Sequence, residues 1–191
     1  MIMLKRKSRK VLIIGAGGIG SYLIDILDRT GVYEITVADP DRYENKNIPY
    51  QNFDDKFVEE NKAKAMAQTY LGVSSIAFPI LTAKQLEGYD LVVCCADNLD
   101  VRRLLYRDGD KWLDLRAQGR NCAYITHRAD KQMYDTLLAG PEGSFSCQGN
   151  EWDGENEGLH FSHVIAAGMG AEWIHRYFAG DDVADFKVVN V

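Results

Sequence analysis

The residues with the clearest chemical potential form a glycine-rich run between two hydrophobic segments. Gly15, Gly17, Gly18 and Gly20 lie in the sequence Gly-Ala-Gly-Gly-Ile-Gly, directly after the apolar run 11–14. Glycines at these spacings permit a tight turn and the close approach of the backbone to a phosphate. The N-terminus of a helix that follows such a turn offers unpaired N–H groups to an anion. The spacing therefore predicts a phosphate-binding turn.

A carboxylate follows this turn at the distance expected in a nucleotide-binding fold. Asp39 lies 19 residues after Gly20, at the end of the next predicted strand, 34–38. A carboxylate in that position can accept a hydrogen bond from a ribose hydroxyl. A glycine turn without a ligand is the alternative interpretation, but a turn that follows a strand and opens a helix favours a nucleotide.

Two further charged residues indicate a triphosphate rather than a dinucleotide. Asp97 and Asn98 follow the predicted strand 91–95. A carboxylate there would repel the pyrophosphate of a dinucleotide, but it fits a site in which Mg²⁺ lies between the carboxylate and a triphosphate. Lys62, at the start of a predicted helix, would serve as a point charge on the phosphates. These residues predict a site for ATP and Mg²⁺, with Asp97 as the metal ligand.

The four cysteines predict no metal or dithiol chemistry, because the sequence contains no Cys-x-x-Cys pair and we therefore expect no zinc. Cys94 and Cys95 are adjacent in a predicted strand, so their side chains should point to opposite faces. Cys147 lies in the predicted loop 140–160 and is a candidate nucleophile. The acidic run 151–157 beside it opposes a reactive thiolate, which leaves an ordinary free thiol as the alternative.

Two other pairs of residues leave alternatives open. Arg116 and Arg120 bracket a predicted hairpin turn, where they either contact substrate or phosphate or form a solvated tip. His160 and His163 could join Cys147 in a metal site, but no third spaced ligand supports it, and histidines at a helix start are commonly capping or solvated.

Apolar periodicity predicts the elements that position these groups. Short apolar runs indicate buried strands, and apolar residues recurring every three or four positions indicate helices. The predicted order is strand 11–14, helix 19–27, strand 34–38, helix 63–70, a weaker strand 76–81, strand 91–95, helix 99–106, a hairpin of 112–118 and 121–127, the loop 140–160, helix 164–178 and a last strand 186–191.

This alternation predicts an α/β fold with a Rossmann-like, mostly parallel sheet, helices on both faces and an antiparallel C-terminal hairpin extension. The active crevice should lie at the carboxyl ends of the first, second and fourth strands. We expect one nucleotide-binding domain over 1–191, with a basic segment at 1–9 and the loop at 140–160.

Composition narrows the function classes. The chain has 191 residues, of which 46% are hydrophobic, which predicts a soluble domain with a sizeable core. A net charge of −6 argues against nucleic-acid partners. No apolar run approaches the ~20 residues of a membrane span. The opening cations lead into an apolar run too short for a secretory signal, so we expect a cytoplasmic location.

In combination these motifs resemble the ThiF/MoeB-like family of the ubiquitin-activating-enzyme-like superfamily, in its small form. The resemblance runs in register over Val11 to Ile125 and more loosely over 162–178. It rests on the glycine turn, the Asp39-x-Asp41 pair, the segment from Asn47 to Gln51, Lys62, and Asp97-Asn98 followed by Arg102.

The resemblance implies an activity, a partner and a set of site residues. Members of that family use ATP and Mg²⁺ to activate the C-terminal glycine of a ubiquitin-fold carrier, a sulfur carrier or modifier ending in Gly-Gly, as an acyl-adenylate. Some pass the acyl group to a cysteine, for which Cys147 is the candidate, and members are homodimers. The implied nucleotide-binding residues are Gly15, Gly17, Gly18, Gly20, Asp39, Asp41, Asn47, Gln51, Lys62, Asp97 and Asn98, with Lys62 on phosphate and Asp97 on Mg²⁺.

Two departures from the family pattern keep other functions open. Tyr50 stands where the family has an arginine. In the family, an N-terminal helix also extends an arginine into the partner's site. Only about ten residues precede the first strand here, so Arg6 or Arg9 would have to substitute for that arginine. The alternatives are a non-catalytic ATP-binding scaffold of the same fold, and an NAD(P)-binding oxidoreductase supported by the glycine turn and Asp39 alone.

Overall fold

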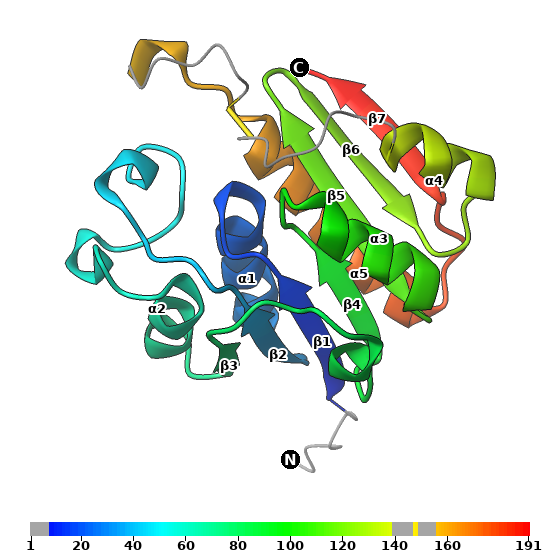
Figure 1. Cartoon of the computed structure of the whole chain (residues 1–191), viewed down its shortest axis with the longest axis horizontal. Helices are drawn as coiled ribbons and strands as arrows, with labels where there is room; N and C mark the ends of the chain where they lie inside the picture. The colour runs from blue at the N-terminus through cyan, green and yellow to red at the C-terminus, as the bar shows by residue number, and fades with distance from the viewer. Residues whose placement is uncertain (1–7, 139–146, 149–155) are drawn as a thin grey trace, which may run out of the picture.

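A computed structural model describes residues 8–138, 147–148 and 156–191 of the chain (Figure 1). Strands and helices alternate over most of this length, as the apolar periodicity predicts. The elements are β1 (Arg9–Ile14), α1 (Gly18–Thr30), β2 (Tyr33–Ala38), α2 (Lys62–Thr69), β3 (Val73–Ile76), β4 (Leu91–Cys94), α3 (Leu99–Asp108), β5 (Trp112–Gln118), β6 (Asn121–Thr126), α4 (Lys131–Leu138), α5 (Ser162–Ala179) and β7 (Phe186–Asn190).

The strands form one seven-stranded sheet in the order β3-β2-β1-β4-β5-β6-β7. Strands β1 to β5 run parallel to one another, whereas β6 pairs antiparallel with β5 and with β7. The order of the strands reverses between β1 and β4, where an open parallel sheet forms its ligand crevice. The predicted α/β fold with an antiparallel extension is confirmed.

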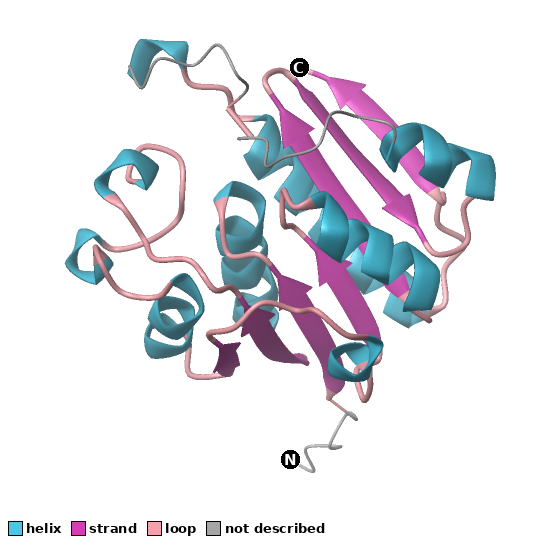
Figure 2. Cartoon of the chain, viewed as in Figure 1, coloured by secondary structure: helices cyan, strands magenta, loops and turns pink. Residues whose placement is uncertain are grey.

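Helices cover both faces of the sheet (Figure 2). Val11 and Ile13 of β1 pack into one core cluster with residues of α1, α2 and α5, while Leu12 and Ile14 pack into a second with residues of α3 and α4. Both faces are apolar because a parallel strand is buried on both sides. Because helices pack on both of its faces, the sheet is a rigid base for the crevice at the ends of its strands.

The third strand was predicted too far along the chain. β3 runs from Val73 to Ile76 and pairs in parallel with β2, rather than covering 76–81. The chain leaves the sheet before Pro79, which cannot donate a ladder hydrogen bond, and the side chains of Phe78 and Leu81 are exposed. Helix α4 was not predicted.

The N-terminal segment and the long loop are described only in part. Residues 1–7 of the basic segment and most of the loop 140–160 lie outside the described residues, and Arg6 lies among them. The guanidinium of Arg9 lies 5.2 Å from the ring centre of Phe178, at the start of β1 and away from the carboxyl ends of the strands. Across the described ranges, no helix is long and apolar enough to cross a membrane.

Candidate functional site

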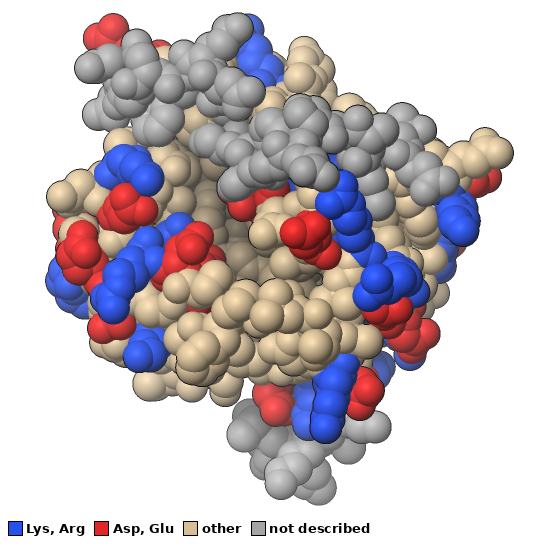
Figure 3. Space-filling view, viewed as in Figure 1, with Lys and Arg blue, Asp and Glu red and all other residues tan. Residues whose placement is uncertain are grey.

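A cavity of about 1020 Å³ lies at the carboxyl ends of β1, β2 and β4. Ile14 and Ala38, which end β1 and β2, line it, as does Cys95, which follows β4. Figure 3 shows the hollow in the middle of this face, with acidic and basic side chains around its rim. The cavity occupies the position at which open parallel sheets bind ligands.

Nearly all the residues predicted for the site line this cavity. The exception is Gly20, which lies inside helix α1. The lining includes Gly15, Gly17, Gly18, Asp39, Asp41, Asn47, Gln51, Lys62, Asp97, Asn98 and Cys147.

The four glycines of the turn serve different purposes. Gly15 has φ 94°, and a Cβ there would lie 2.8 Å from the backbone nitrogen of Ala96. A Cβ on Gly20 would lie 1.9 Å from the carbonyl oxygen of Gly15. Packing therefore requires glycine at both positions. A Cβ on Gly17 would meet only Gln51 Nε2, at 3.8 Å, so the open space beside Gly17 fits the close approach of a ligand.

Helix α1 presents its N-terminus to this space. Gly17 is the N-cap residue and has no side chain to accept hydrogen bonds from the first turn. The first amides of a helix have no partner within it, and the helix dipole adds positive potential there. The turn can therefore hold a phosphate oxygen.

Asp39 ties the end of β2 to the glycine turn. Its Oδ2 accepts a hydrogen bond of 2.7 Å from the amide of Ala16, and its Oδ1 accepts one of 2.8 Å from the amide of Asp41. Burial raises the pKa of this carboxyl, although the amide hydrogen bonds and Lys62 partly offset the effect. Asp39 thus fixes the shape of the site as well as lining it.

Lys62 brings a buried ammonium group to the same wall. It is the first residue of α2, its side chain is 10% exposed, and its Nζ lies 4.0 Å from Asp41 Oδ2. A cation held out of water beside the glycine turn attracts an anion more strongly than a surface lysine does.

Asn61 positions these groups and was not assigned a role from the sequence. Its Nδ2 donates to the carbonyl oxygens of Asp39, at 2.9 Å, and Asp41, at 3.0 Å. Its Oδ1 accepts from the amide of Lys64 and caps helix α2. An asparagine directly before a predicted helix is an N-cap signal, so the sequence could have identified the cap. It could not have identified the clamp, the pair of hydrogen bonds from Asn61 Nδ2 to the carbonyl oxygens of Asp39 and Asp41.

The segment from Asn47 to Gln51 is held largely by its own side chains. Asn47 Oδ1 accepts from the amide of Glu44, and Asn47 Nδ2 donates to the hydroxyl of Tyr50 at 3.0 Å. Burial raises the pKa of Tyr50, so this side chain is neutral at physiological pH. Gln51 Oε1 is buried with no hydrogen-bond partner among the described residues, at the edge of the cavity.

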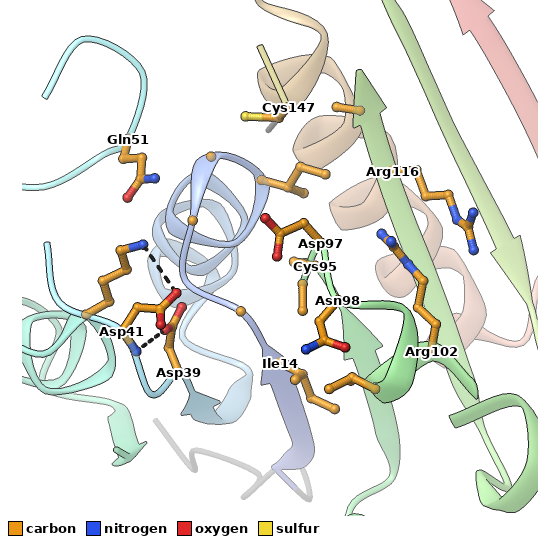
Figure 4. A pocket seen from close by; sticks show the side chains of 18 of the residues that line it. Ile14, Asp39, Asp41, Gln51, Cys95, Asp97, Asn98, Arg102, Arg116 and Cys147 are labelled. Atoms are coloured by element: carbon orange, nitrogen blue, oxygen red, sulfur yellow. Dashed lines mark hydrogen bonds and ion pairs between the residues drawn. The ribbon is translucent and has the colours of Figure 1, made fainter. Parts of the chain in front are cut away.

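Asp97 and Asn98 follow β4 but have different surroundings. Asn98 caps α3, because its Oδ1 accepts from the amide of Asp100 at 2.7 Å. Asp97 lies between the side of the cavity that carries Asp39 and the side that carries Arg102 and Arg116 (Figure 4). In the described part of the chain, no three His, Cys, Asp or Glu side chains are grouped to hold a metal ion. A single carboxylate fits Mg²⁺ when nucleotide phosphates and water supply the other ligands.

Cys147 lies beside the first residue of α1. Its carbonyl oxygen accepts from the amide of Gly119 at 3.1 Å, and the side chain of Gln148 exchanges two hydrogen bonds with the backbone of His160. Burial raises the pKa of the Cys147 thiol to about 11. The structure therefore brings this residue into the cavity as a neutral thiol.

The structure separates the two arginines that the sequence left open. Arg120 is exposed at the hairpin turn, whereas Arg116 lines the cavity from β5. Alternation along β5 places Arg116 on the face of Asp114 and α3. It is therefore a wall residue, with Arg102 of α3 beside it.

The sheet order, the glycine turn on a helix N-terminus and the cavity at the strand ends define an α/β protein of the Rossmann type. The sequence profile of the ThiF family matches residues 3–170. The chain belongs to the ThiF family.

Curated relatives include an adenylyltransferase and sulfurtransferase and a modifier-activating enzyme. The adenylyltransferase and sulfurtransferase UBA4 of Yarrowia lipolytica is 31% identical over 108 residues, which cover 52% of this chain and 27% of that protein. The ubiquitin-like modifier-activating enzyme 5 of Oryza sativa subsp. japonica is 27% identical over 163 residues, covering 72% of this chain and 37% of that protein. The chain thus spans between about a quarter and two fifths of the length of these relatives.

Solved structures of E. coli MccB share the fold. One superposes with a TM-score of 0.69 at 19% identity, covering 95% of this chain and 62% of MccB. The structure titled as MccB with ATP gives a TM-score of 0.66 at 20% identity, covering 96% of this chain and 64% of that one. At these identities the likeness shows a common fold.

Proposed function

We propose that this protein adenylates the C-terminal carboxylate of a ubiquitin-fold carrier with ATP. The observation that carries the proposal is the convergence of the glycine turn, the buried Lys62 and Asp97 on one cavity. Support for the activity comes from the relatives named as adenylyltransferase and modifier-activating enzyme. Support for the nucleotide comes from the likeness in fold to the structure of MccB with ATP.

The proposed reaction needs no nucleophile from the protein. A carboxylate oxygen of the carrier attacks the α-phosphorus of ATP, and the bond from that phosphorus to the bridging oxygen of pyrophosphate breaks. Pyrophosphate leaves with the electron pair, and the carrier retains the adenylyl group as a mixed anhydride. The protein must hold two anions together and neutralise the charge between them. We assign that task to Lys62 and the N-terminus of α1, which both border the cavity.

We assign each role to a residue that lines the cavity. Mg²⁺, when bound, would neutralise phosphate charge and orient the leaving pyrophosphate. The proposed assignments are Asp97 for the metal, Lys62 and the amides around Gly17 and Gly18 for phosphate, Asp39 for the ribose, and Asp41, Asn47, Gln51 and Asn98 for the remaining nucleotide contacts.

ATP:pyrophosphate exchange with candidate carriers ending in Gly-Gly tests the proposal. Asp97→Asn should reduce exchange by about 100-fold or more, the scale of losing one charge-stabilising group. Asp100→Asn is the matched control, because the Asp100 side chain is 85% exposed and pairs with Arg103. Loss of exchange in both variants, or in neither, would contradict the role of Asp97.

Tyr50 supports a second candidate function, a scaffold that binds ATP without adenylation. This side chain is 8% exposed and uncharged at a position where the family resemblance implies an arginine. ATP binding without exchange across every carrier tried would favour the scaffold. A tightly copurifying nicotinamide cofactor and no response to ATP would instead favour an oxidoreductase.

Three finer assignments belong to the same proposal. Cys147 is a candidate acceptor in a later step, in which its thiolate attacks the acyl carbonyl, AMP leaves and a thioester forms. A carrier adduct on non-reducing gels that Cys147→Ser abolishes would support it. A homodimer is testable by light scattering after gel filtration, and a cytoplasmic location by fractionation of cells.

A further inference from the structure

Hydrogen bonds tie the segment 147–148 to two other parts of the chain. The carbonyl oxygen of Cys147 accepts a hydrogen bond of 3.1 Å from the amide of Gly119, in the turn between β5 and β6. The side chain of Gln148 bonds to the backbone of His160, which lies just before α5. Gln148 is 1% exposed, so these bonds form out of contact with water. The segment is therefore held at both of its residues.

The backbone of His160 determines how the amide group of Gln148 is oriented. Gln148 Oε1 accepts from the amide of His160 at 2.8 Å, and Gln148 Nε2 donates to the carbonyl oxygen of His160 at 3.0 Å. The reverse orientation would place two donors together and two acceptors together. The two bonds resemble those that a pair of residues exchanges in an antiparallel sheet. The positions of both polar atoms of Gln148 are therefore defined.

This orientation determines which nitrogen of His163 carries the proton. Gln148 Nε2 lies 3.4 Å from His163 Nδ1, and an amide nitrogen can only donate, so Nδ1 is the acceptor. Burial lowers the pKa of His163, so the ring is neutral at physiological pH. His163 Nε2 has no hydrogen-bond partner among the described residues, so no opposing contact selects the other tautomer. A neutral ring that accepts at Nδ1 carries its proton at Nε2.

The ring of His163 and the thiol of Cys147 meet at the start of α1. A Cβ built on Gly18 would lie 3.5 Å from Cγ and Cδ2 of His163, and Cys147 Sγ lies closer still to the same point. The ring centres of Tyr22 and Tyr50 lie 5.7 and 6.2 Å from that of His163. The side chain of His163 is therefore enclosed, and Gln148 bonds to a ring that has little room to move.

We propose that Gln148 is a positioning residue for Cys147: it anchors the segment 147–148 to the start of α5 and so holds the thiol beside the first turn of α1, in the cavity. Gln148 follows Cys147 directly, so a fixed Gln148 side chain restricts the backbone that carries the thiol. The inference rests on the proposed function, because it concerns the thiol that is proposed to receive the acyl group.

Alkylation of Cys147 by iodoacetamide measures whether the anchor holds. Gln148→Ala removes the hydrogen bonds to His160 and His163, so the segment should move into solvent and the pKa of Cys147 should fall from about 11 toward 9.0. At pH 8 the alkylation rate should then rise at least about 10-fold, because the thiolate fraction increases. Gln148→Met keeps most of the side-chain volume without the hydrogen bonds and should have the same effect.

Gln132→Ala is the matched control, because it removes the same side chain from an exposed position on α4 and should leave the alkylation of Cys147 unchanged. Circular dichroism establishes that each variant is folded.

The wild type offers a second test that needs no variant of Gln148. Proton–nitrogen correlation spectra of the isotope-labelled protein should show His163 as the neutral tautomer with its proton on Nε2. His163→Asn identifies these signals among those of the four histidines. A proton on Nδ1, or a charged ring at pH 7, would overturn the hydrogen-bonding that carries the inference.

Transfer of the acyl group should change in the opposite direction from alkylation. Gln148→Ala should keep ATP:pyrophosphate exchange but form the carrier adduct on Cys147 at least about 10-fold more slowly, because the thiol no longer lies where the acyl-adenylate forms. A general loss of stability would not make the same thiol more reactive toward iodoacetamide and less reactive toward the carrier.

The outcomes separate this inference from the proposed function. Alkylation of Gln148→Ala and Gln148→Met at or below the wild-type rate would overturn the inference even with exchange intact, as would adduct formation at the wild-type rate. Alkylation and the tautomer of His163 depend on neither nucleotide nor carrier. The expected results for both, in a protein that adenylates no carrier, would contradict the proposed function and support the anchoring of Cys147 by Gln148.

Discussion

The thiol of Cys147 occupies the space that a side chain at Gly18 would need. A Cβ built on Gly18 lies 2.6 Å from Cys147 Sγ, far inside van der Waals contact. The contact joins the first residue of α1 to a segment from the other end of the chain. A side chain at Gly18 would therefore displace the thiol beside it, in addition to any phosphate that approaches the turn.

Gly18→Ala should lower the free energy of unfolding by about 1–3 kcal/mol, because the new methyl group overpacks the thiol. Cys147→Ala removes the sulfur, so the double variant should recover about 0.5–1 kcal/mol of that loss as coupling between neighbours. Urea denaturation of the four proteins measures the cycle. Strictly additive losses would show that the two residues do not touch in solution.

Gly17→Ala and Gly20→Ala should separate binding from folding. Gly17 has φ −76°, and a methyl group there meets no close neighbour, so its variant should fold normally. The methyl group would enter the space proposed for phosphate, and ATP affinity measured by calorimetry should fall about 10-fold or more, which corresponds to about 1.4 kcal/mol. Gly20→Ala should fail to fold, because its methyl group meets the rigid carbonyl of Gly15. A Gly17→Ala protein with unchanged ATP affinity would argue against the phosphate site.

Alkylation of Cys147 should be slow at neutral pH and accelerate with pH. Burial raises the pKa of this thiol from 9.0 to about 11, so at pH 7 its thiolate fraction is about 100-fold below that of an unperturbed thiol. Since the thiolate is the nucleophile, the rate should rise until the pH reaches about 11. Mass spectrometry after iodoacetamide pulses identifies the peptide, and Cys147→Ser confirms the assignment. A rate that levels off below pH 9 would mean that the site activates the thiol.

The elements predicted well are those whose signal is local. The apolar runs of β1 and β4 can be recognised in the sequence because a strand that is buried on two faces requires apolar residues along its length. β3 was misplaced because a short edge strand, Val-Ser-Ser-Ile, carries no clear periodicity. Its hydrogen bonds with β2 decide its position, and they come from distant residues.

In the site, too, features with a local sequence signal could be predicted, and contacts between distant segments could not. Motif spacing places Asp39 and Asp97 directly after strands and Lys62 at the start of a helix, and the fold brings all three to one cavity. Spacing along a hairpin indicates which face Arg116 occupies, but not that α3 lies over that face with Arg102. Nor does any spacing relate Gly18 to Cys147, because that contact depends on where the long loop returns to the sheet.

Asn61 offers a test of how the site is held together. Asn61→Asp keeps a good N-cap acceptor for α2, but it replaces the Nδ2 donor with an oxygen that faces the carbonyl oxygens of Asp39 and Asp41. If the clamp matters, Asn61→Asp should destabilise the protein by about 1–3 kcal/mol, the scale of leaving buried polar groups unsatisfied. Its ATP affinity should also fall, because Asp39 and Lys62 lose their common support. Thermal unfolding and ATP titration measure both effects, with Asn52→Asp, in the neighbouring loop, as a control for the added charge. Stability and affinity equal to those of the wild type would mean that Asn61 serves only as a helix cap.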